Sequence, residues 1–61
     1  MPGINEVELQ SLRHLMSVES VAVKKFNMFS QQAIDPQFKT FLQNSALKSD
    51  QNYRVLMGYL Q

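Results

Sequence analysis

The sequence contains no cysteine, and only two glycines and two prolines occur among its 61 residues. Without cysteine the chain forms no disulfide, and the usual spacings of zinc ligands are absent. A chain this short buries only about 60% of the surface that its unfolded form exposes. Small scaffolds without a disulfide or a metal need unusually good helix packing or a partner chain. The sequence therefore predicts an oligomer, with a homodimer as the simplest closed form.

The sequence also lacks an excess of either charge, because six Lys/Arg and five Asp/Glu residues leave a formal net charge of +1. The chain thus has no net field to attract nucleic acid or an anionic membrane. No apolar run approaches the roughly 20 residues that span a bilayer. The opening residues MPGINEVE lack the charged and apolar regions of a signal peptide. We expect no nucleic-acid partner, no membrane partner and an intracellular location.

The scarce prolines and glycines leave one strong break inside the chain, at Asp35-Pro36. Asp35 can cap the N-terminus of a following helix, and Pro36 suits the first helical position. A residue before proline is pushed out of the α region, so the preceding helix must end before Asp35. No alternating strand pattern competes, and the predicted class is all-α. The prediction is one domain over residues 1–61, with a helix at about 5–33, a turn at 34–35 and a helix at about 36–60.

Both segments carry apolar residues at steps of three and four, the spacing of one helix face. A turn this short makes the helices antiparallel, as in an αα-hairpin. The apolar stripes are too wide for the single seam of a hairpin, so we expect two hairpins to pack as a four-helix bundle. The residues expected to pack in the core or at the dimer interface are Leu12, Leu15, Phe26, Phe29, Phe38, Leu42, Leu56 and Leu60.

One carboxylate, Glu19, interrupts the apolar stripe of the first helix. If the turn centres between residues 34 and 35, Glu19 lies level with Ser49, Asp50 and Tyr53. An ionised carboxylate in an apolar core must find partners or take up a proton. Glu19 could accept hydrogen bonds from Ser49 and Tyr53 in a polar layer that fixes the helix register. It could instead lie at a hydrated seam, or bind a metal across two chains.

The metal interpretation has weak candidates in Glu19 and Asp50. Di-iron bundles combine a Glu from each of two helices with a Glu-x-x-His pair from each of the others. Residues 48–53 read KSDQNY and contain neither Glu nor His. Without imidazole, selective binding of iron or zinc is not expected. We therefore predict no cofactor.

His14 is the only histidine, and it lies on the flank of the first helix that carries Val18 and Val21. No Ser or Cys nucleophile is identifiable beside it, and no acidic residue on its face completes a ligand set. A packing or interface role for His14 is the favoured interpretation. We expect no catalytic residue and no enzyme activity.

Residues 9–60 resemble the coat F domain of spore-forming bacteria, a ferritin-like family. The matching features are Glu19 in an aliphatic helix, the aromatic pair Phe26 and Phe29, and the turn AIDPQ at 33–37, with Phe38 and Leu42 following. The resemblance implies a hairpin that forms half of a ferritin-like four-helix bundle, located at the forespore surface or in the spore coat. Family members often carry Glu and His in the second helix, where this chain has Ser49, Asp50, Asn52 and Tyr53.

The leading functional hypothesis is a non-enzymatic structural protein that self-associates in or near the bacterial spore coat, with other coat proteins as partners. One alternative is a ferritin-like metal-binding protein with a degenerate carboxylate site. Another is a small helical adaptor whose Val21 and Met28 flank docks a further helix.

Overall fold

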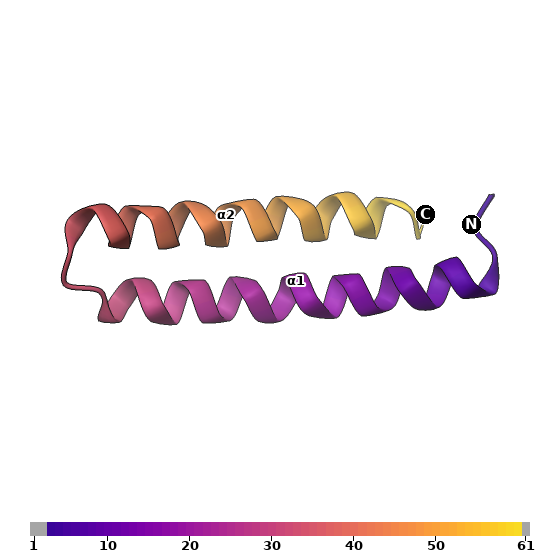
Figure 1. The fold of residues 1–61 in the computed structure, drawn as a ribbon. Coiled ribbons are helices and arrows are strands. Elements are labelled where there is room, and N and C mark those ends of the chain that lie inside the picture. Colours follow the sequence, from indigo (N-terminus) through magenta and orange to yellow (C-terminus); the bar gives the residue numbers. More distant parts are fainter. Residues whose placement is uncertain (1–2, 61) are drawn as a thin grey trace.

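A computed structural model describes residues 3–60 of the chain. It contains two helices, α1 at Glu6–Gln32 and α2 at Pro36–Gly58, and residues 3–60 include no strand. The helices lie side by side and run in opposite directions, and the start of α1 lies at the same end of the hairpin as the end of α2 (Figure 1). The all-α helical hairpin expected from the sequence is confirmed.

A capping box fixes the start of α1. The Asn5 side chain accepts a hydrogen bond from the Glu8 backbone N–H at 2.8 Å, and the Glu8 carboxylate accepts one from the Asn5 N–H at 3.3 Å. This reciprocal arrangement satisfies two backbone donors that a helix start leaves free. Gly3 precedes the box with a φ of 84°, a left-handed conformation that glycine adopts without a Cβ penalty.

Three residues, Ala33–Asp35, connect the helices, and each end of this connector is fixed locally. The N–H of Ala33 donates to the Phe29 carbonyl at 3.0 Å, and Ala33 itself is extended. Asp35 caps α2 by accepting from the Phe38 N–H at 2.8 Å, with Pro36 in the first turn. A connector this short leaves no room for a crossover, so the helices return antiparallel.

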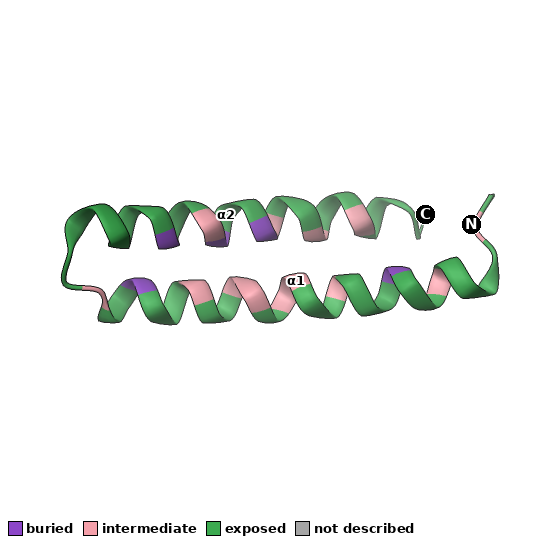
Figure 2. Ribbon diagram, in the orientation of Figure 1, coloured by how far each residue is buried: buried purple, intermediate pink, exposed green. Residues whose placement is uncertain are grey.

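The core is a thin strip along the seam between α1 and α2. Its buried apolar residues are Leu12, Leu42 and Ala46, and the buried polar residues Ser30 and Ser49 lie in the same strip. None of the described side chains is completely shielded from solvent. Buried positions occur only where one helix faces the other (Figure 2). Small residues at the seam suit a close approach of the two helix axes.

The residues predicted to pack therefore divide into two groups. Leu12 and Leu42 are buried in the seam, and Phe26 and Leu56 are half-buried at its edge. A helix has only one strip that a single neighbour can cover, so Leu15, Phe29 and Phe38 lie outside the seam, and Leu60 lies beyond the end of α2. The four exposed residues are Leu15, Phe29, Phe38 and Leu60.

Leu42→Ala should lower the free energy of unfolding by about 2–5 kcal/mol, because it deletes methyl groups from the most enclosed part of the seam. Leu42 is 4% exposed, whereas Leu47 on the same helix is 61% exposed and makes a matched control. Leu47→Ala should change the same quantity by no more than about 0.5 kcal/mol. Urea unfolding followed by circular dichroism, at one chain concentration, measures both values. Equal losses for the two variants would contradict the placement of the core.

Candidate functional site: an apolar face with a polar centre

The hairpin is long and flat, with Cα extents of 46 × 14 × 11 Å. Two helices side by side leave two broad faces. The grooves between the helices differ in volume and in lining residues from one face to the other. Three grooves, each of about 400 Å³, lie between apolar side chains. Two smaller grooves, of about 280 and 170 Å³, carry Arg13, Lys24 and Asp50. The larger grooves also hold charged side chains, namely Glu8, Glu19 and Lys48, each beside apolar or aromatic neighbours.

We call the broad face that carries the three larger grooves the apolar face. Its α1 side is set by Leu15, Val18 and Phe29, which share one helix face by their spacing, and Leu15 and Val18 line its central groove. Phe38 and Phe41 lie one turn apart on α2, with ring centroids 6.4 Å apart and planes at 11°. The apolar face consists of Leu15, Val18, Phe29, Phe38, Phe41, Val55, Leu56 and Tyr59, all exposed except the half-buried Leu56.

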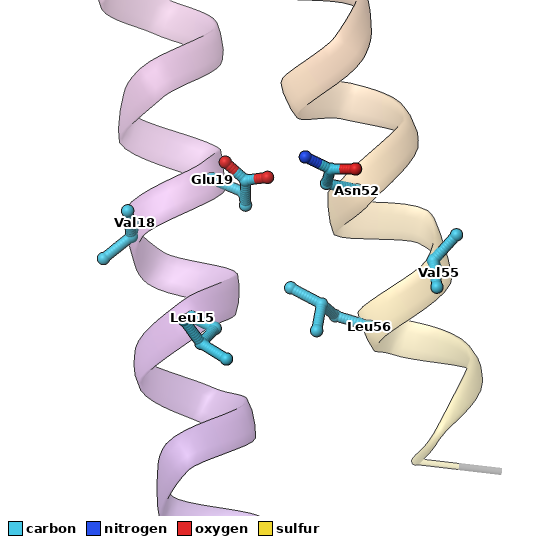
Figure 3. Close-up of a pocket in the computed structure, with 6 residues that line it drawn as sticks. All are labelled: Leu15, Val18, Glu19, Asn52, Val55 and Leu56. Carbon is cyan, nitrogen blue, oxygen red and sulfur yellow. The ribbon is translucent and has the colours of Figure 1, made fainter.

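Glu19 and Asn52 lie at the centre of the apolar face. They line the same groove, and Figure 3 shows the carboxylate and the amide on facing sides of it, above Leu15 and Leu56. Glu19 is half-buried, whereas Asn52 is exposed. The hydrogen bonds found among residues 3–60 include none that the Glu19 carboxylate accepts. The polar centre of the face therefore has hydrogen-bonding capacity to offer a neighbour.

The other members of the predicted polar layer lie elsewhere. Ser49 is buried in the seam itself and lines the groove that contains Phe26 and Phe41. Tyr53 is half-buried and lines both smaller grooves, away from Glu19. The structure thus brings Glu19 together with Asn52. Sequence reasoning did not single out Asn52, because an estimate of level from the centre of the turn places Glu19 opposite residues 49, 50 and 53.

The two metal candidates, Glu19 and Asp50, do not share a groove. Positions 50 and 52 of one helix point about 160° apart, so Asp50 lies away from the apolar face that Asn52 marks. Asp50 accepts a hydrogen bond from the Arg54 Nε at 2.9 Å. Among the described residues, no group of three or more His, Cys, Asp or Glu side chains could hold a metal ion. The carboxylates of one hairpin are thus not arranged as a ligand set.

Four side-chain hydroxyl groups donate hydrogen bonds to backbone carbonyls of their own helix. The hydroxyls of Ser17, Ser30 and Ser45 donate to backbone carbonyls three or four residues earlier, at 2.7–3.2 Å, and Thr40 does the same at 3.0 Å. His14 is exposed on α1. These bonds are ordinary helix back-bonding and do not pair a hydroxyl with a base.

Comparison of the chain with protein-family models, with curated proteins and with solved structures finds no match. Neither α1 nor α2, over the residues described, has a stretch both long and apolar enough to cross a bilayer. Function must therefore be argued from the apolar face and its polar centre.

Because Glu19 and Asp50 lie on different faces, we expect the purified chain to carry no stoichiometric iron, manganese or zinc. Elemental analysis of protein prepared without chelator should give the same low metal content for the wild-type chain and for Glu19→Gln. Chelator should leave the melting temperature unchanged, since no folding free energy comes from a metal. One metal ion per chain or per dimer, lost in Glu19→Gln, would restore the metal-binding interpretation.

Proposed function

We propose that this chain is a non-enzymatic structural protein whose helical hairpins pair into a four-helix bundle. The observation that carries the proposal is the apolar face, with seven exposed and one half-buried apolar or aromatic side chains, set against three buried apolar residues in the seam. A hairpin that hides so little apolar surface is marginal alone, because most helical stability comes from packing an amphipathic face. Pairing covers the surface that the seam leaves in water.

The proposed setting of this bundle is the bacterial spore coat, with other coat proteins as partners. Support comes from the resemblance of residues 9–60 to the coat F domain, above all the turn around Asp35-Pro36. The turn geometry supports the same proposal, since Asp35 caps α2 and Pro36 occupies its first turn. A paired hairpin offers an extended, rigid element of the kind that a layered assembly can use.

Pairing predicts that the chain sediments as a dimer, and that its melting temperature rises with concentration, because the folded state binds a second copy that the unfolded state does not. Phe41→Asp should convert the dimer to monomer at micromolar concentration, since it places a charge on the apolar face. Phe41 is 60% exposed in the single hairpin, and Leu47, at 61%, is the matched control on the same helix.

Leu47→Asp should leave the dimer intact, because position 47 points away from the apolar face. Sedimentation equilibrium measures the mass of each variant directly. A wild-type chain that is folded and monomeric in dilute solution, with a melting temperature independent of concentration, would overturn the proposal.

The coat setting has its own test in the source bacterium. A chain with a short epitope tag should fractionate with the coat layer of purified spores, and Leu47→Asp should do the same. Phe41→Asp should lose this association because the bundle no longer forms. Recovery of the wild-type chain only from vegetative cells would refute the coat setting and leave the pairing itself intact.

A further inference from the structure

The apolar face has the size and character that a second copy of the chain needs. Its Cα envelope of 46 by 14 Å corresponds to an area of roughly 600 Å² before side chains extend it, and a stable interface buries about 800 Å² per partner. The acidic residues in its grooves are Glu8 and Glu19, and Lys48 is the basic one. A near-neutral face can meet its own copy without a large charge penalty. The inference below rests on the proposed pairing and specifies its geometry.

Two hairpins that meet through the same face are related by a two-fold axis in the plane of contact. If the axis runs along the helices, both turns lie at the same end, and α1 lies over α2 of the second copy. If the axis runs across the helices, the turns lie at opposite ends, and α1 lies over α1. Residues at one level of the hairpin then meet different partners in the two arrangements.

We propose that the axis runs along the helices, so that Glu19 of each copy faces Asn52 of the other. Glu19 and Asn52 occupy one level of the hairpin, on opposite sides of one groove (Figure 3). Exchange of α1 for α2 across the interface places each carboxylate against an amide that donates to it. The two copies thereby form two equivalent carboxylate–amide hydrogen bonds, each involving an ionised acceptor. The half-buried Glu19 gains the partner that its own hairpin does not supply.

The crosswise axis gives an unfavourable centre. Residue 19 is the midpoint of α1, which spans Glu6–Gln32, so an axis across the middle of the bundle sets Glu19 over its own copy. Two carboxylates that face each other in a dry interface repel, and this repulsion weakens association. The same arrangement brings Glu8, near one end of α1, over the Phe29 region near the other. Both carboxylates of the face would then lose solvent without a donor.

An axis along the helices also gives favourable contacts in the other two grooves of the apolar face. Leu15 and Leu56 line the central groove, Phe26 and Phe41 line the groove toward the turn, and Glu8 and Tyr59 line the groove at the open end. Exchange of α1 for α2 keeps each groove against its own copy. Apolar side chains then meet apolar side chains along most of the face, and Glu8 stays at the open end beside a tyrosine.

The cysteine-free chain allows a direct test of the axis. Val18 and Val55 line the central groove from different helices and lie toward its outer edges (Figure 3). Purified Val18→Cys and Val55→Cys chains are mixed and treated with a short bismaleimide, and the products are identified by mass spectrometry. The lengthwise axis predicts a Val18→Cys chain joined to a Val55→Cys chain as the main product, at least tenfold above either self-linked dimer.

Ser17→Cys serves as the control, because Ser17 is exposed on the same helix and lines one of the smaller grooves. Position 17 points away from the central groove, so cross-linking of Ser17→Cys to Val55→Cys should be at least tenfold lower. Sedimentation of the same samples reports the dimer independently of the cross-link. A dimer whose products are self-linked Val18→Cys and self-linked Val55→Cys overturns the lengthwise axis and leaves the proposed pairing standing. A dimer without cross-links overturns the apolar face as its interface, and a monomer overturns both proposals.

A charge added at the polar centre tests the same contact without a cross-linker. Asn52→Asp should raise the dimer dissociation constant at least tenfold, because Glu19 of the second copy then faces a carboxylate. Gln51→Asp adds the same charge one residue away, on an exposed position outside the groove, and should change the constant less than twofold. Helicity of both variants, measured at concentrations above the dissociation constant, shows that each still folds. Equal dissociation constants for Asn52→Asp and the wild-type chain overturn the proposed contact.

Discussion

A single seam between two helices can hide only a narrow strip of each, and the structure follows from that constraint. The strip here holds Leu12, Leu42 and Ala46 with two serines, and eight apolar or aromatic residues remain on one broad face. No disulfide compensates for this small core. If hairpins pair as proposed, the hydrophobic effect acts between hairpins as well as within one, and folding is then linked to pairing.

The hairpin could be predicted from the sequence because its determinants are local. Asp35 and Pro36 end one helix and start the next through capping and a fixed φ, and both effects depend only on neighbouring residues. The division of the apolar stripe between seam and surface could not be predicted in the same way. Leu12 and Leu15 lie one turn apart on one stripe, yet only Leu12 is buried. A rotation of α1 about its axis by a few tens of degrees decides between them, and packing sets that rotation.

The candidate site shows the same limit. Glu19 was identifiable because a carboxylate in an apolar stripe is costly wherever the helix packs. Its neighbour Asn52 was not, since an estimate of level from the centre of the turn places Glu19 opposite residues 49, 50 and 53. The three-residue connector and the rotation of α2 bring Asn52 into the groove and turn Tyr53 toward the smaller ones. An error of one or two residues in the estimated level along α2 is enough to assign the wrong partner residue to Glu19.

Retention of a carboxylate at the middle of an apolar face has a physical rationale if the face is an interface. A leucine at position 19 would add buried apolar area, but it would also remove the contribution of the polar centre to the difference between the two ways of pairing the face. A polar group that finds a hydrogen-bond donor in only one of the two arrangements lowers the affinity of the dimer. It also raises the free-energy difference between the two arrangements. Single polar positions act in this way in coiled coils, where they select register at some cost in stability. Glu19 and Asn52 line the central groove of the face beside Leu15, Val18, Val55 and Leu56, and there they are the polar residues able to make that selection.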